Sequence, residues 1–166
     1  MQFKGKAHNF GDDVNTDYII SGKYKFKTLD MKKLAKHVME DLDPDFYSKV
    51  TEGDFIVAGS NFGCGSSREQ APLAIRYAGI SAVLASSFAR IFYRNAINTG
   101  LPVIECDTSQ ISDGDNLRVD LTKGIITNMT KGIFLQAKPL PEVMIKILND
   151  GGLAPHFRMH GGFNFD

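Results

Sequence analysis

The sequence predicts an α/β domain with a mainly parallel central sheet. Three short apolar runs, at 54–59, 81–87 and 101–105, read as strands buried on both faces. Segments 72–80 and 88–100 lie between them and carry the apolar spacing of helices. This strand, helix, strand alternation favours parallel pairing with right-handed crossovers.

The N-terminal third predicts two short strands and a helix. Segment 4–10 reads as a strand, and the loop at 11–17 is rich in Asp and Asn, which favour turns. The apolar residues at 18–21 predict a second strand. After a basic loop at 22–30, residues 31–42 have apolar side chains at helical spacing and predict a helix.

The C-terminal third predicts an antiparallel extension followed by a helix. Segments 116–121, 124–129 and 132–137 read as short strands joined by polar turns. Residues 140–152 predict an amphipathic helix with a proline in its first turn and two glycines at its end. The tail at 154–166 is glycine-rich and polar, and we expect it to be mobile.

Length and charge limit the classes of function. A chain of 166 residues fits one domain, and we assign residues 1–166 to it. The 19 basic and 19 acidic residues cancel, so we expect no general attraction to nucleic acid or to a membrane surface. We find neither an apolar stretch of roughly 20 residues nor a signal peptide, and we expect a cytoplasmic protein.

The cysteines and histidines do not predict a metal site within this chain. Two cysteines, Cys64 and Cys106, are too few to hold a zinc ion or an iron–sulfur cluster, and we expect both to be reduced. The four histidines show no metal-binding spacing, so no metal ligand is assigned; they are His8, His37, His156 and His160.

The segment NFGCGSSREQ at 61–70 is the strongest candidate for a binding site. It follows the buried strand at 54–59 and places Ser66, Ser67 and Arg68 on a turn loosened by glycine. Loops that lead into a helix present unpaired backbone N–H groups and a partial positive charge. Such a turn is therefore suited to an anion.

A purely structural explanation of the two serines is also open. Ser66 with Glu69, or Ser67 with Gln70, matches the capping box of a helix N-terminus. Either register places Pro72 at the fifth or sixth helical position, where its missing N–H is needed. We therefore expect the helix to begin near Glu69 or Gln70, which leaves the hydroxyls and the guanidinium on the loop.

Three blocks of sequence together resemble a known family. GDDVNTDYII, VAGSNFGCGSSREQAPLAIRYAGI and ASSFARIFYRNAINTGLPVIE are similar to the small subunits of 3-isopropylmalate dehydratase, which form an aconitase-like swivel domain. The resemblance covers about residues 5–153. It implies a swivelling three-layer β/β/α domain that closes over a large subunit, and that subunit carries a [4Fe–4S] cluster.

The resemblance also implies roles for individual residues. Ser66 would be the catalytic base, while Ser67 and Arg68 would bind a substrate carboxylate. Asp17 matches an acidic residue that orients an arginine or a histidine of the partner, although it also fits an Asx turn. The implied reaction interconverts 2-isopropylmalate and 3-isopropylmalate by dehydration and rehydration in leucine biosynthesis, with iron of the large subunit as the Lewis acid.

The identity of the hydroxy acid depends on the loop at 22–30, which departs from the pattern of isopropylmalate enzymes. Lys25 and Lys27 would bind a third carboxylate in a homoaconitase, or they point to solvent. A 2,3-dimethylmalate dehydratase is a further alternative within the class. An alternative outside the dehydratases is a non-catalytic module that binds an anion. A Walker-type phosphate loop would carry a lysine before the serine, and this sequence has none there.

Overall fold

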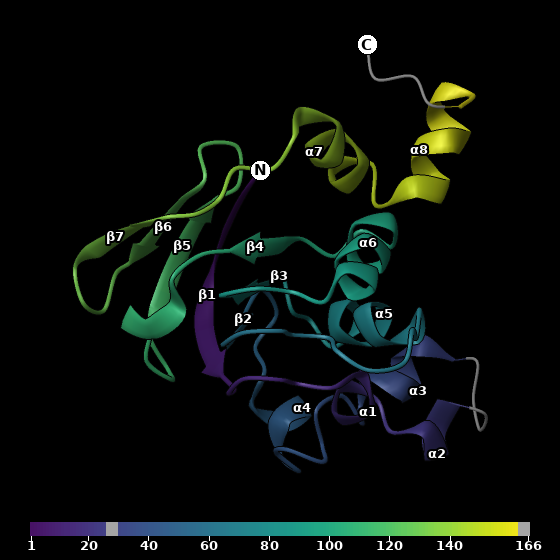
Figure 1. Cartoon of the computed structure of the whole chain (residues 1–166), viewed down its shortest axis with the longest axis horizontal. Coiled ribbons are helices and arrows are strands. Elements are labelled where there is room, and N and C mark those ends of the chain that lie inside the picture. The colour runs from purple at the N-terminus through teal and green to yellow at the C-terminus, as the bar shows by residue number, and fades with distance from the viewer. Residues whose placement is uncertain (26–29, 163–166) are drawn as a thin grey trace.

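The computed structural model describes residues 1–25 and 30–162, apart from the side chain of Lys25. Within these residues, seven strands form one sheet in the order β4-β3-β2-β1-β5-β6-β7 (Figure 1). The pairs β1–β2, β2–β3 and β3–β4 are parallel. The pairs β1–β5, β5–β6 and β6–β7 are antiparallel. The strands are β1 (Gln2–Asn9), β2 (Phe55–Ala58), β3 (Ala82–Ala85), β4 (Val103–Glu105), β5 (Asn116–Asp120), β6 (Ile125–Asn128) and β7 (Ile133–Gln136). The predicted α/β class is confirmed, with parallel pairing in one half of the sheet.

The helices gather mainly around the parallel half. In Figure 1 the strands β5, β6 and β7 lie on the left and helices α5 and α6 on the right. Helix α5 packs against α3 and α6, and α6 packs in turn against α7 and α8. The helices are α1 (Thr16–Ile19), α2 (Gly22–Lys25), α3 (Met31–Ala35), α4 (Phe46–Lys49), α5 (Gln70–Tyr77), α6 (Arg90–Asn98), α7 (Glu142–Asn149) and α8 (Leu153–His160), with a 3₁₀ turn at Thr108–Gln110.

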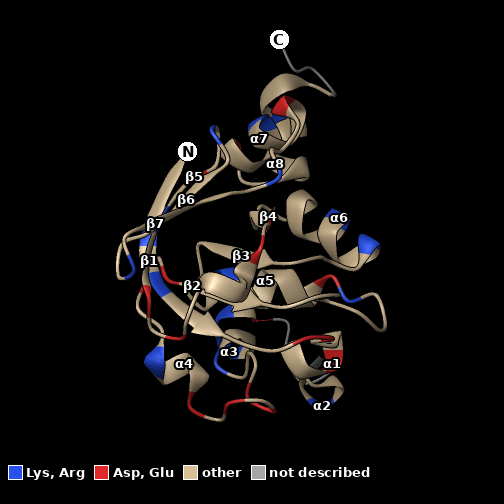
Figure 2. Cartoon of the chain, turned by 60° about the vertical axis from the view of Figure 1, so that its left-hand side comes forward, with Lys and Arg blue, Asp and Glu red and all other residues tan. Residues whose placement is uncertain are grey.

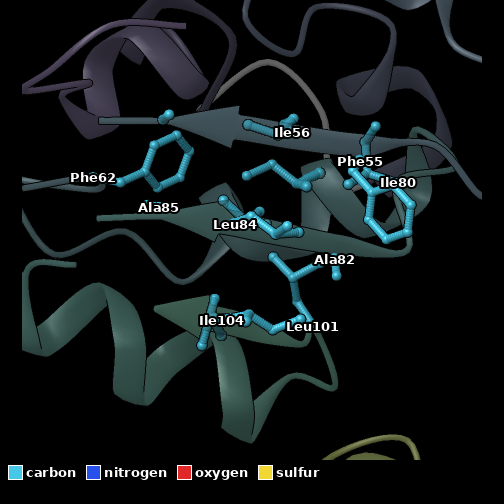
Figure 3. Close-up of a cluster of buried hydrophobic side chains, with 14 of the residues drawn as sticks. Phe55, Ile56, Phe62, Ile80, Ala82, Leu84, Ala85, Leu101 and Ile104 are labelled. Carbon is cyan, nitrogen blue, oxygen red and sulfur yellow. The ribbon is translucent and has the colours of Figure 1, made fainter. Parts of the chain in front are cut away.

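The core lies around the parallel strands. Every residue of β2 and of β3 is buried, which explains why their sequences are unbroken apolar runs. Figure 3 shows Phe55, Ile56 and Leu84 packed together, with Phe62 from the segment after β2 in the same cluster. Burial in β5 alternates instead, as expected for a strand of an antiparallel sheet.

Charged segments of both signs are spread over the molecule (Figure 2). This distribution accords with the zero formal net charge. Among the helices of the described residues, none has the length and apolarity required to span a bilayer.

The start of α5 agrees with the sequence prediction. The helix begins at Gln70, so Pro72 occupies its third position. The first four N–H groups of a helix have no intrahelical acceptor, and the missing N–H of Pro72 therefore costs no helical hydrogen bond. The residue before the helix, Glu69, makes no side-chain cap, and neither capping box is formed.

The prediction of a strand at 18–21 is wrong. The Asn15 side chain accepts a hydrogen bond from the backbone N–H of Asp17 and caps α1. The backbone N–H groups of Tyr18 and Ile19 both donate to the Asn15 carbonyl, which closes the short helix. This capping interaction outweighs the strand preference of the apolar residues.

The helix predicted at 31–42 is shorter than expected. Helix α3 ends at Ala35, and residues 36–38 continue as turns whose N–H groups donate to the carbonyl three residues before. Met39 then has a left-handed backbone (φ 59°) and donates its N–H to the Ile19 carbonyl, so the helix does not resume. The apolar spacing nonetheless reflects burial, since Leu34, Ala35, Val38 and Met39 are all in the core. In the tail, where we expected no regular structure, residues 153–160 form α8; residues 163–166 lie outside the described part.

A buried carboxylate joins β1 to the segment before β2. Asp54 accepts hydrogen bonds from the backbone N–H groups of Lys6 (3.0 Å) and Thr51 (2.9 Å) and pairs with His8 Nε2 at 2.8 Å. Burial opposes ionisation of Asp54, but these hydrogen bonds outweigh it and lower its pKa. The ionised form therefore stabilises the fold.

We expect Asp54→Ala to lower the free energy of unfolding by about 3 kcal/mol at pH 7, because it leaves buried donors without an acceptor. Since the folded pKa is lowered, this contribution is present above the unfolded carboxyl pKa of about 3.9 and is lost as pH falls through the folded value. Urea denaturation of both proteins at a series of pH values measures this difference in the free energy of unfolding. Asp41→Ala, at an exposed position, is the control and should change stability by less than about 0.5 kcal/mol.

Candidate functional site

Three loops meet at the carboxyl end of the parallel strands, where open α/β sheets bind ligands. They follow β1, β2 and β3 and comprise residues 10–15, 59–69 and 86–89. The first loop, together with Thr16 at the start of α1, is joined to the second by backbone hydrogen bonds, such as that from Thr16 N–H to the Cys64 carbonyl at 2.8 Å. This joining places the serine-rich segment against the segment that precedes Asp17.

Two glycines allow the second loop its path. Gly63 and Gly65 have positive φ angles of 82° and 93°, which side-chain-bearing residues rarely adopt. A Cβ atom at Gly63 would strike the ring of Phe92, and one at Gly65 would lie 2.6 Å from Asn15 Oδ1. The loop therefore needs glycine at both positions to pack against α6 and α1.

Among the predicted site side chains that the structure describes, Arg68 is the most buried, with 15% of its side chain exposed. Its Nη1 donates to the Ile20 carbonyl at 3.2 Å, and its Nη2 forms an ion pair with Asp17. A Cβ atom at Gly22 would lie 3.4 Å from Nη1, so the loop at 22–30 begins beside the guanidinium. A guanidinium has five N–H donors, and further ones are available for a planar anion.

Ser66 and Ser67 are exposed beside this guanidinium. The Thr16 hydroxyl donates to the Ser66 carbonyl at 2.7 Å, and Asn95 Nδ2 donates to the Ser67 hydroxyl at 3.3 Å. The Ser66 hydroxyl has no hydrogen-bond partner among the residues that the structure describes. It is thus positioned through its backbone while its side chain is available to a ligand.

A pocket of about 210 Å³ joins this loop to the N-terminus of α6. Ala89 precedes the helix without a side-chain cap, and Tyr93 is the first residue whose N–H reaches back to it. The N–H groups of residues 90–92 therefore have no intrahelical acceptor and favour negative charge. The pocket is lined by Thr16, Gly63, Gly65, Ser66, Ser67, Arg68, Ala89, Arg90, Ile91, Phe92 and Asn95.

The structure brings together most, but not all, of the predicted site residues. Ser66, Ser67 and Arg68 line one pocket, and Asp17 is paired with Arg68. Lys25 is the last residue of α2, and its side chain is not described. Lys27 lies outside the described residues, so its predicted role stays a prediction.

Sequence reasoning left three parts of the site unassigned. It assigned no role to Thr16, none to Arg90 and Asn95 of α6, and it did not place the N-terminus of α6 at the pocket. The only sequence signal was that the segment at 88–100 begins a helix without a capping residue, which leaves its amides open.

A larger cavity lies elsewhere in the described part of the chain. It has a volume of about 570 Å³ between α6, β4 and residues 138–144, and only Arg90 is common to it and the smaller pocket. Lys138 and Glu105 on its wall are 3.5 Å apart and neutralise each other. We place the candidate site at the smaller pocket because its hydroxyls, guanidinium and helix amides converge there.

The two cysteines do not fit an iron–sulfur cluster held by this chain. Cluster ligands are thiolates, usually four in number. Burial, with the nearby charge of Asp107, raises the pKa of the Cys106 thiol to about 12. Cys64 is half-buried in the loop after β2, and both cysteines are free thiols.

Comparison with known proteins gives consistent relationships over nearly the whole chain. Residues 8–109 match the model of the aconitase C-terminal domain family. A curated relative from Archaeoglobus fulgidus, named 3-isopropylmalate dehydratase small subunit 2, is 60% identical over 161 residues, which is 97% of this chain and 98% of the relative. The 3-isopropylmalate dehydratase small subunit of Caldicellulosiruptor bescii is 57% identical over 155 residues, 92% of this chain and 93% of that one.

A solved structure shows the same fold. The crystal structure of a protein titled 3-isopropylmalate dehydratase, from Methanocaldococcus jannaschii, has a TM-score of 0.94 to this chain. The two are 51% identical, and the match covers 97% of this chain and 96% of the other. The predicted family resemblance is therefore confirmed.

The contact between Thr16 and the Ser66 carbonyl gives a test of how the site loop is held. Thr16→Val keeps the shape of the buried side chain but removes the donor, and we expect a loss of about 1–3 kcal/mol in stability. Hydrogen exchange at residues 66–68 should become faster. Thr108→Val, which removes a similar bond to the Ala58 carbonyl (2.7 Å), is the matched control. Equal exchange at 66–68 in both variants would contradict a specific role of Thr16.

Proposed function

The chain belongs to the aconitase C-terminal domain family, and we propose that it is the small subunit of a 3-isopropylmalate dehydratase. This enzyme is a hydro-lyase that acts with a large subunit and interconverts 2-isopropylmalate and 3-isopropylmalate in leucine biosynthesis. The relatives at 52–60% identity carry this name over nearly their whole lengths. The alternatives within the class, homoaconitase and 2,3-dimethylmalate dehydratase, have no such support, and a non-catalytic anion-binding module does not accord with these names.

The groups that line the smaller pocket are the observation that best supports the proposed chemistry. A free hydroxyl, a largely buried guanidinium and the open amides of a helix N-terminus face one pocket of about 210 Å³. This set of groups suits a small hydroxy dicarboxylate: the guanidinium binds a carboxylate, and the hydroxyl exchanges a proton with the adjacent carbon. A pocket that only held an anion would not need an unpaired hydroxyl.

The partner in this proposal is a large subunit that carries a [4Fe–4S] cluster. The family suggests an iron–sulfur cluster in the partner, and the burial of Cys106 accords with the absence of cluster ligands in this chain. In the complex the cluster supplies the Lewis acid that polarises the substrate hydroxyl. We place the complex in the cytoplasm, and we assign no nucleic-acid or membrane partner.

Ser66 is the base of the proposed reaction. Its Oγ takes a proton from the carbon next to the one that bears the hydroxyl, so that loss of the hydroxyl leaves an alkene. Addition of water in the opposite sense at the neighbouring carbon then completes the isomerisation. Because a serine hydroxyl is a weak base, the alkoxide needs stabilisation, which Arg68 and the amides of residues 90–92 can supply.

Arg68 and Ser67 hold the substrate carboxylate. The Ile20 carbonyl orients the guanidinium, and Asp17 pairs with it from an exposed position, which leaves other N–H donors for the substrate. Asn95 donates to the Ser67 hydroxyl, so that the Ser67 proton is available to a carboxylate oxygen. Asp17, which is more exposed than Arg68, can also meet a cationic residue of the large subunit when the domain closes.

Reconstitution tests the proposed function. The isolated chain should not turn over 2-isopropylmalate and should gain activity only with a cluster-loaded large subunit, because the Lewis acid is absent from its own residues. In the complex, Ser66→Ala should lower kcat by roughly 10²–10⁴-fold with little change in stability. Ser48→Ala, at an exposed serine of α4, is the matched control and should keep full activity. A fully active Ser66→Ala complex would contradict the assigned base.

Specificity is tested by two cationic residues that we expect to behave differently. Arg68→Lys loses the planar fork and should weaken every substrate of the class together. If Lys27 binds a third carboxylate, Lys27→Ala should weaken transition-state binding of a homocitrate-type substrate by roughly 2–5 kcal/mol and leave that of isopropylmalate unchanged. If the chain belongs to an isopropylmalate enzyme, Lys27→Ala should change the free energy derived from kcat/KM by less than about 0.5 kcal/mol for both substrates. The ratio of kcat/KM values for the two substrates distinguishes the outcomes.

A further inference from the structure

We propose that Asp150, His156 and His160 form a binding site for a divalent transition metal ion, with Zn²⁺ as the preferred occupant. Asp150 is the residue that follows α7, and the two histidines lie one turn apart on α8. Their potential ligand atoms all lie within 4.8 Å of one another. No residue of the proposed catalytic pocket takes part, so this site is separate from the proposed function.

The geometry is close to that of a metal complex. His156 Nδ1 is 2.6 Å from Asp150 Oδ2, and His160 Nε2 is 3.0 Å from the same oxygen. Ligands bound to one zinc ion at about 2.0–2.2 Å are roughly 3–3.5 Å apart. Both separations from Asp150 Oδ2 are therefore close to those between two ligands of one ion, and the two histidine nitrogens lie within 4.8 Å of each other.

The backbone holds the three groups in place. The turn at Gly151 and Gly152 has φ angles of 90° and 128°, and a Cβ atom at Gly152 would lie 2.6 Å from the Asn98 carbonyl oxygen at the end of α6. Arg76 of α5 donates to the carbonyls of both Thr99 (2.9 Å) and Gly151 (3.2 Å). The turn that orients Asp150 toward α8 is thus fixed by two other helices.

Burial divides the site into a closed side and an open side. The side chain of His156 is 1% exposed, that of Asp150 20% and that of His160 36%. An ion can enter from the His160 side, where solvent can supply a fourth ligand.

The donor set selects the class of metal. Two imidazole nitrogens and one carboxylate oxygen suit Zn²⁺ and its neighbours, whereas Ca²⁺ and Mg²⁺ prefer six or more oxygens. The i,i+4 spacing places both histidines on one face of α8. An ion bound there would tie α8 to the end of α7 and stabilise the C-terminal part of the chain.

Calorimetric titration with zinc chloride tests the proposal on the untagged, chelator-treated chain. We expect one-to-one binding and a rise in the thermal unfolding temperature, with neither effect from Ca²⁺ or Mg²⁺. His160→Ala should weaken binding by at least about 100-fold, because one of three ligands is lost. Arg158→Ala, at an exposed position on the same helix, is the matched control and should bind as the wild type does.

A second variant protects the test against misfolding. Asp150→Asn keeps a side chain of similar shape and should also weaken zinc binding, while circular dichroism checks that α8 remains. Binding that is absent in the wild type, or equally tight in His160→Ala, Asp150→Asn and Arg158→Ala, would overturn the proposal. Retained binding in the Arg158 variant, with loss in the other two, would support it.

Discussion

The backbone hydrogen bonds that join Val14 and Thr16 to Gly63 and Cys64 are the constraint on which the candidate site depends. They continue the parallel pairing of β1 and β2 beyond the ends of the strands, with Asn15 opposite Cys64. The close approach leaves no room for a side chain at Gly65, and the same contact lets Thr16 hold the Ser66 carbonyl. Because α1 starts at this contact, Asp17 is placed against Arg68. The site geometry therefore follows from the register of two strands.

The strands and helices of the parallel half could be predicted because burial alone determines their sequences. Every residue of β2 and β3 is buried, and the apolar runs report this directly. The failures occurred where a local hydrogen bond overrides the pattern. Asn15 caps a helix at 16–19 where apolar residues suggested a strand. The helix expected to reach residue 42 stops at Ala35, and the left-handed Met39 prevents it from resuming. Neither interaction has a periodic signal in the sequence.

The site was partly predictable for a related reason. Ser66, Ser67 and Arg68 are adjacent in the chain, so one motif could indicate them, and the position of Pro72 removed them from the helix. The N-terminus of α6 comes from a distant segment, and only the packing of the loops brings its amides to the pocket. His156 and His160 could not be assigned from the sequence either, because only the fold brings them together with Asp150. Their spacing has meaning only on a helix, and α8 was not predicted from the polar tail.

The pairing of Arg68 with Asp17 bears on how a substrate would enter the site. Asp17 is 57% exposed, so solvent screens its interaction with the guanidinium, and the ion pair is weak. The largely buried guanidinium is instead oriented by its hydrogen bond to the Ile20 carbonyl, which does not neutralise its charge. A substrate carboxylate can therefore join or replace Asp17 at small cost, while Arg68 keeps its orientation. Since Gly22 begins the loop at 22–30, the group that binds the common carboxylate lies beside the segment expected to distinguish one substrate from another.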